Sequence, residues 1–124
     1  MFGRLEALAD GRPIAIFPEG TRSRTGHLRE GKAGAALIAM RSGAPIVPAA
    51  ISGTQRIFPS GSRWPRPSRV RIRIGEPLDF SRYADQRGDR FVERAITDEI
   101  MYELMALSGR EYVDVYASTL KTAA

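Results

Sequence analysis

The sequence predicts an α/β fold in which a central sheet is flanked by helices. Two short apolar runs, at residues 14–17 and 46–51, have the length of buried strands. Between them, residues 32–42 repeat apolar side chains at helical spacing. Residues 70–74 then alternate as a strand does, and residues 91–107 form a second amphipathic segment. The order strand, helix, strand, strand, helix along one chain therefore favours the α/β class.

The composition limits the kinds of chemistry that are possible. There is no cysteine, which excludes disulfides, thiol nucleophiles and cysteine metal sites, and no cluster has the spacing of metal ligands. No apolar run approaches the roughly 20 residues of a membrane span. With no signal peptide and no internal linker, we expect residues 1–124 to belong to one domain in the cytoplasm.

The first half of the chain predicts a helix, a strand, a loop and a second helix, in that order. Apolar residues at helical spacing up to Asp10-Gly11 predict a short helix that stops there. Ile14–Phe17 then reads as a buried strand, followed by a loop over Pro18–Gly31. The helix at 32–42 presents Ala33, Ala36, Leu37 and Met40 on one face. Gly43 is placed to end this helix.

The second half begins with the strand at 46–51, in which Pro48 must occupy an edge, a strand end or a bulge. Residues 54–68 are rich in proline, glycine and serine and predict a long loop. Val70, Ile72 and Ile74 alternate with arginines, which predicts one buried and one cationic strand face. The helix over 91–107 has an apolar stripe and ends near a glycine. The stripe consists of Phe91, Val92, Ala95, Ile96, Ile100 and Leu104, and the glycine is Gly109.

The loop after the first predicted strand is the leading candidate for a ligand site. Glycine, two hydroxyls, one acid and two arginines occur together, as suits a phosphate. Its residues are Glu19, Gly20, Thr21, Arg22, Ser23 and Arg24. Lys32 stands at the start of the next helix, where an anion is favoured and a cation is not. The plain alternatives are a solvated turn with a local Glu–Arg pair and a surface lysine.

His27 is the only histidine, so histidine acid–base chemistry within the chain would have to use it. Gly31 and Lys32 follow it at four and five residues, and neither is an acid. A lone histidine in a loop is more often an ordinary surface residue, and this interpretation is the preferred one.

The net charge of +5 points to an anionic partner. Six arginines and two aromatic residues fall in a stretch, from Thr54 to Gly75, that contains no acid. They are Arg56, Arg63, Arg66, Arg69, Arg71 and Arg73, with Phe58 and Trp64. This composition suits an anionic membrane surface. Single-stranded nucleic acid is a less favoured partner, and an exposed cationic strand face is the plain alternative.

Four segments in order resemble the glycerolipid acyltransferases, in particular the bacterial 1-acyl-sn-glycerol-3-phosphate acyltransferases. Phe-Pro-Glu-Gly-Thr-Arg-Ser at residues 17–23 is similar to the third conserved block of that family. Gly-Lys-Ala-Gly at residues 31–34 is similar to the helix start that follows. The Val-Pro strand at residues 46–53 resembles the fourth block, and residues 70–77 resemble the next strand with its Gly-Glu-Pro end.

The resemblance implies acyl transfer from acyl-CoA or acyl carrier protein to the free hydroxyl of a lysophospholipid, with no further cofactor. It implies that an acceptor phosphate is held by residues of the third block with Lys32, and that the acyl side of the cleft is shaped by two residues of the fourth block. The phosphate residues are Glu19, Gly20, Thr21, Arg22, Ser23 and Lys32, and the cleft residues are Val47 and Pro48. The implied location is peripheral, on the cytoplasmic face of the membrane.

The chain departs from the family pattern in one respect. The first block of the family, a histidine with an aspartate five positions later, has no counterpart, because Lys32 occupies that position after His27. The second block is also unmatched. We therefore expect the C-terminal part of one acyltransferase domain, without the catalytic base and inactive alone. The alternatives are a non-catalytic basic module that binds anionic phospholipid, and an acyltransferase for another acceptor.

Overall fold

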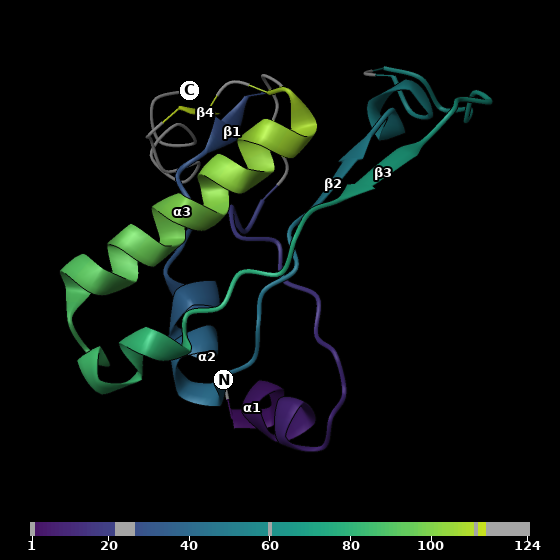
Figure 1. Cartoon of the computed structure of the whole chain (residues 1–124). Helices are drawn as coiled ribbons and strands as arrows, with labels where there is room; N and C mark the ends of the chain where they lie inside the picture. The colour runs from purple at the N-terminus through teal and green to yellow at the C-terminus, as the bar shows by residue number, and fades with distance from the viewer. Residues whose placement is uncertain (1, 22–26, 60, 111, 114–124) are drawn as a thin grey trace.

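The computed structural model describes residues 2–21, 27–59, 61–110 and 112–113 of the chain. It confirms a mixed α/β class, with helices beside short strands (Figure 1). Three α-helices, two 3₁₀ helices and four strands occur among these residues. In chain order they are α1 (Phe2–Ala9), β1 (Leu28–Arg29), α2 (Gly34–Ser42), β2 (Ala49–Ser52), η1 (Thr54–Arg56), β3 (Arg71–Ile74), η2 (Ser81–Gln86), α3 (Arg90–Ser108) and β4 (Tyr112–Val113). Among the described helices, none combines the length and the apolar character needed to cross a membrane.

The core lies between α2 and α3. Small side chains on α2 allow close packing against two isoleucines of α3, and Phe80 closes the cluster. Its buried members are Ala35, Ala36, Ala39, Met40, Phe80, Ile96 and Ile100. Burial of these side chains provides the main stabilisation of the chain.

The helix ends follow the sequence signals. Gly43 adopts a left-handed φ of 68° after α2, and its N–H donates to the carbonyl of Ala39 over 2.9 Å. The Asp89 carboxylate caps α3 by accepting from the Phe91 N–H over 2.8 Å, and Gly109 ends that helix with a φ of 67°. The predicted helices at 32–42 and 91–107 are therefore confirmed, α2 beginning two residues later than expected.

The sheet differs from the expected central sheet, because the described strands form two separate pairs. β1 pairs in parallel with β4, and β2 pairs antiparallel with β3. The predicted strand at Ile14–Phe17 is wrong: this segment has no ladder partner among the described residues. Ile16 packs against the core, whereas Phe17 is 78% exposed. Packing against the core therefore accounts for Ile16 and leaves Phe17 unexplained.

The strand predicted at 46–51 begins later, at Ala49. Before it, Ile46 forms an isolated bridge with Leu78. Pro48 precedes the ladder, as its missing N–H requires, and its carbonyl accepts from the Gly75 N–H over 2.9 Å. The β2–β3 ribbon therefore begins at a defined root, where Pro48 and Gly75 meet.

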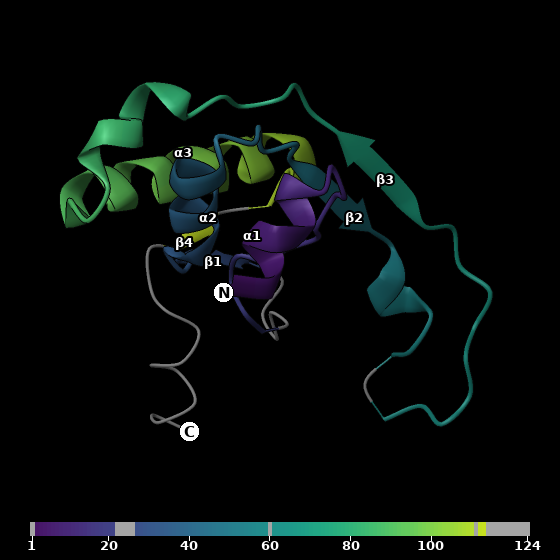
Figure 2. The same cartoon turned by 90° about the horizontal axis from the view of Figure 1, so that it is seen from below.

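The alternation in β3 is confirmed, but the predicted burial of its apolar face is wrong. Ile72 and Ile74 are 62% and 70% exposed. Figures 1 and 2 both show the β2–β3 ribbon extending away from the helices. Arg71 and Arg73 line a small depression together with Leu107, so the cationic face is the one that turns toward the end of α3. There the Arg73 Nη1 donates to the carbonyl of Leu107 over 3.3 Å. The helix thus approaches the arginine side and leaves the isoleucines open.

Gly53 sets the geometry of the far end of the ribbon. Its φ is +95°, and a Cβ at this position would lie 2.3 Å from the carbonyl oxygen of Arg69. Gly61 has a similar φ of +84° but nothing within 4 Å of its Cβ position. The two glycines therefore share a strained backbone region and differ in the space around them.

We expect Gly53→Ala to open the ribbon, because the methyl group must displace the backbone of the facing strand. Amide hydrogen exchange of β2 and β3 should accelerate at least tenfold, about 1.4 kcal/mol of local opening free energy. Gly61→Ala is the control, since its loop can relax into open space. Equal acceleration in both variants would show that backbone conformation alone, and not the contact with Arg69, decides the ribbon.

Candidate functional site

The candidate site begins at a tight turn over residues 17–20. The Gly20 N–H donates to the carbonyl of Phe17 over 3.0 Å, and Gly20 has a φ of +68°. This conformation favours glycine, so Gly20 is needed for the turn itself. Thr21 follows and is half-buried. Arg22, Ser23 and Arg24 lie outside the described residues, so their predicted contact with phosphate stays a prediction.

The turn is fastened to the segment that leads into α2. The Glu19 Oε2 accepts from the backbone N–H of Arg29 over 2.8 Å. One residue earlier, the carbonyl of Pro18 accepts from the backbone N–H of Lys32 over 2.9 Å. Glu19 therefore has a structural task that the sequence did not reveal, because its carboxylate holds the turn against residues 29–32.

Lys32 places its ammonium group beside Gly20. A Cβ at Gly20 would lie 3.0 Å from the Lys32 Nζ, so the lysine side chain runs directly across the turn. Lys32 is exposed and stands two residues before the first residue of α2. The N-cap residue Ala33 has no polar side chain to cover the N–H groups of the first turn. An anion at this position would meet a cation and a helix N-terminus together.

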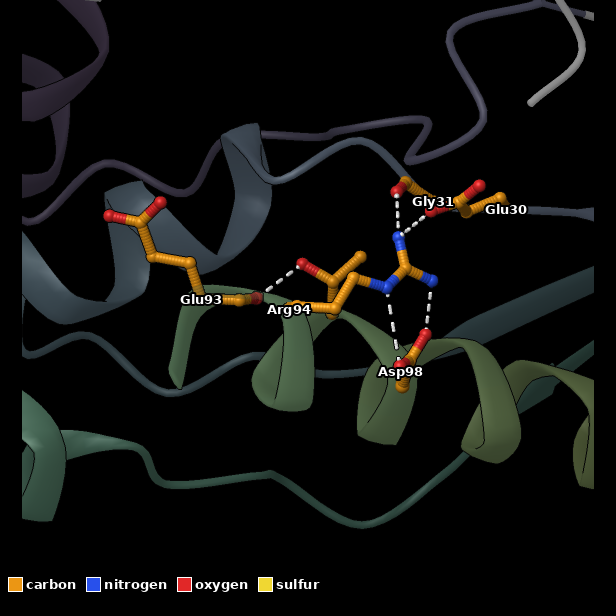
Figure 3. A network of polar contacts seen from close by, with 6 residues as sticks. Glu30, Gly31, Glu93, Arg94 and Asp98 are labelled. Carbon is orange, nitrogen blue, oxygen red and sulfur yellow. Dashed lines mark hydrogen bonds and ion pairs between the residues drawn. The ribbon is translucent and has the colours of Figure 1, made fainter. Parts of the chain in front are cut away.

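Arg94 of α3 fixes this segment from the other side (Figure 3). Its guanidinium pairs with the carboxylates of Glu30 and Asp98 and also donates to the carbonyl of Gly31 over 3.3 Å. The Arg94 and Glu30 side chains are only 30% and 14% exposed. Partial burial strengthens such a pair relative to one on the surface. The Arg94 network, formed by Glu30, Gly31, Arg94 and Asp98, thus anchors the residue that precedes Lys32.

Gly31 also permits direct contact with α3. A Cβ at this position would lie 2.9 Å from side-chain atoms of Thr97 and of Met101, both of which are buried. Only a glycine lets the backbone approach the helix this closely. Sequence reasoning missed the Arg94 network, although Arg94 and Asp98 have the spacing of a helical ion pair.

Three further residues that the sequence singled out lie outside the turn. Val47 is 51% exposed, and Pro48 is buried at the root of the ribbon, so their role in an acyl cleft stays a prediction. His27 is half-buried immediately before β1. Within the described part of the chain, no group of acids and histidines could hold a metal ion.

Two shifted pKa values concern η2 and not the turn. The backbone N–H of Ser81 hydrogen-bonds to Asp79 and lowers the pKa of that carboxyl below its ordinary value. A hydrogen bond with Tyr83 raises the pKa of Arg82. Both side chains are exposed, and we assign both pKa shifts to hydrogen bonds at the N-terminal end of η2.

We expect Arg94→Ala to destabilise the fold by roughly 1–3 kcal/mol, because two partly buried carboxylates lose their cation. Amide exchange of Arg29 and Lys32 should accelerate with it. Arg12→Ala removes an exposed pair with Asp10 and should cost less than about 1 kcal/mol. Thermal unfolding and hydrogen exchange measure both effects. Similar losses of stability in the two variants would rule out a special anchoring role for Arg94.

Comparisons with known proteins place this segment within a family match. A family model described as Acyltransferase matches residues 3–52, which contain the turn, Lys32 and α2. A 1-acyl-sn-glycerol-3-phosphate acyltransferase of Chlamydomonas reinhardtii is 35% identical over 81% of this chain and 30% of its own length. The enzyme of that name from Borreliella burgdorferi is 39% identical over 44% of this chain and 22% of its own length.

A solved structure is similar as well. The 1-acyl-sn-glycerophosphate acyltransferase PlsC of Thermotoga maritima superposes with a TM-score of 0.57 at 30% identity, over 82% of this chain and 43% of its own chain. The chain spans less than a third of the length of the curated relatives named above. The matched blocks, the family model and the shared fold lead to one conclusion: the chain belongs to the glycerolipid acyltransferase family.

Proposed function

We propose that the protein serves the transfer of an acyl group to the free hydroxyl of 1-acyl-glycerol-3-phosphate, and that this chain holds the phosphate of that acceptor. The observation that carries the proposal is the Lys32 ammonium, which lies across Gly20 at the start of α2. The names of the relatives support the acceptor. Acyl-CoA or acyl carrier protein is the proposed donor.

We propose tasks for three residues of this site. Lys32 supplies a positive charge at the place where the uncapped first turn of α2 already favours an anion. Glu19 keeps the turn closed through the Arg29 N–H, so the backbone around Gly20 can stay close to a ligand. We propose that Arg22, by its match to the family block, adds a bidentate contact to phosphate. Binding then depends on the charge of the headgroup.

The proposal assigns no general base to these 124 residues. The sequence contains one histidine, and the residue five positions after it is Lys32 instead of an aspartate. Without the histidine–aspartate block of the family, the acceptor hydroxyl would keep its proton and attack the acyl carbonyl slowly. The chain alone is therefore expected to bind acceptor without turning it over.

We also propose that it works as a peripheral protein at the cytoplasmic face of an anionic membrane.

The binding of monomeric short-chain lysophosphatidate, measured by calorimetry, tests the site. Lys32→Ala should weaken binding by about tenfold or more, since one charge-assisted contact is worth roughly 1.5–3 kcal/mol. Lys121→Ala is the matched control, because Lys121 is the only other lysine. Monoacylglycerol, which lacks the phosphate, should not compete.

Three results would contradict the proposal. Equal affinity of wild type and Lys32→Ala would remove Lys32 from the site. Equal binding of monoacylglycerol and lysophosphatidate would favour a lipid-binding module without a phosphate site. Turnover of lysophosphatidate by the chain, abolished by Arg22→Ala, would show that a base is present after all.

A further inference from the structure

The β2–β3 ribbon ends in a loop that forms the far tip of the molecule as seen in both views (Figures 1 and 2). We call residues 53–59 and 61–69 the arm tip. Internal contacts give it a defined shape: the Arg66 N–H donates to the carbonyl of Ile57 over 2.8 Å, and the Ser68 hydroxyl donates to the carbonyl of Gly53 over 3.4 Å. Gly53 also packs tightly against Arg69.

The arm tip carries a shallow, open concavity of about 570 Å³ with a cationic lining. Three arginines line it together with polar and proline side chains. The lining residues are Gln55, Arg56, Pro59, Arg66, Pro67, Ser68 and Arg69. None of the ion pairs found in the described part of the chain involves Arg56, Arg66 or Arg69. The sequence contains no acid between Thr54 and Gly75, so no residue of this stretch neutralises the positive charge.

Two large aromatic side chains accompany the arginines. Trp64 is 81% exposed and Phe58 is 63% exposed. Exposed aromatic side chains are unfavourably hydrated, and beside unpaired arginines they indicate a binding surface. They suit the interface of a bilayer, where an amphipathic ring lies at the level of the headgroups and arginine meets lipid phosphate.

We propose that the arm tip is a docking element for anionic phospholipid bilayers. The concavity lined by Arg56, Arg66 and Arg69 receives the phosphate of an anionic headgroup, and Trp64 and Phe58 enter the interface beside it. This inference rests on the membrane part of the proposed function and assigns a site to it. The site is separate from the acceptor turn, since the two share no residue.

The shape of the tip favours a bilayer over nucleic acid. A single strand is usually held in a groove that follows several nucleotides, with aromatic rings stacked on successive bases. The arm tip instead offers one concavity at the end of a narrow ribbon. Its aromatic residues are only two, Phe58 and Trp64, which is enough for anchoring at an interface but not for a stacking track.

Trp64 makes the proposal directly measurable, because it is the only tryptophan of the chain. With phosphatidylcholine vesicles that contain phosphatidylglycerol, its fluorescence should shift to shorter wavelength and be quenched by brominated acyl chains. Vesicles of phosphatidylcholine alone should leave it nearly unchanged. A spectrum that stays the same with anionic vesicles would overturn the insertion of Trp64.

Charge variants test the concavity. The triple variant Arg56→Gln, Arg66→Gln, Arg69→Gln should partition onto phosphatidylglycerol vesicles about a hundredfold more weakly, as expected for three basic residues near the surface. The control Arg4→Gln, Arg12→Gln, Arg90→Gln removes the same charge from exposed positions elsewhere. It should lose less than about threefold. Circular dichroism verifies the fold of each variant.

Each outcome separates this inference from the acceptor site. Equal losses in the two triple variants would mean that net charge alone drives binding and that the tip has no special role. A stronger response of Trp64 to single-stranded polynucleotide than to anionic vesicles would replace the bilayer with nucleic acid. Lys32→Ala should bind these vesicles, which contain no lysophosphatidate, as wild type does, so either proposal can fail while the other stands.

Discussion

The ion pairs of Arg94 are the constraint on which the site depends. They join α3, whose isoleucines form the core with α2, to the two residues just before Lys32. Arg94 lies 63 residues away from Gly31 in sequence, so this is a long-range closure of the chain. Gly31 is followed by Lys32, whose N–H donates to the carbonyl of Pro18. Pro18 lies within the turn that ends at Gly20. Each step is a short contact, and together they tie a surface turn to the core.

This connection matters because an unanchored turn would have to become ordered when it binds a ligand, and that ordering costs binding free energy. Glu19 directs its Oε2 to the Arg29 N–H, and no ion pair joins Glu19 to Lys32 in the described part of the chain. The positive charge of Lys32 is thereby left beside Gly20 for an external anion.

The sequence predicted what depends on local signals. The two long helices, the caps at Gly43 and Gly109 and the alternation of β3 follow from spacing and from turn chemistry. It failed where a neighbour decides the outcome. Ile72 was expected inside because alternation says that one face differs from the other, but it does not say which face is covered. Arg94 was missed for a related reason, since its partner Glu30 is distant in the chain. The phosphate contacts of the third-block residues and Lys32, and the acyl-cleft role of Val47 and Pro48, stay predictions from the family resemblance.

The helix α3 also sets the relation between the two cationic regions. In the first half of α3, Arg94 holds the segment just before Lys32. Near the end of α3, Leu107 contacts Arg73 and lies beside Gly75 at the root of the ribbon. These positions are 13 residues apart on one helix, which is about 20 Å at 1.5 Å per residue. An isolated two-stranded ribbon is marginally stable, so its direction is inherited from this root contact. A change at Leu107 would therefore move the arm tip relative to the turn at residues 17–20 while leaving the residues of both unchanged.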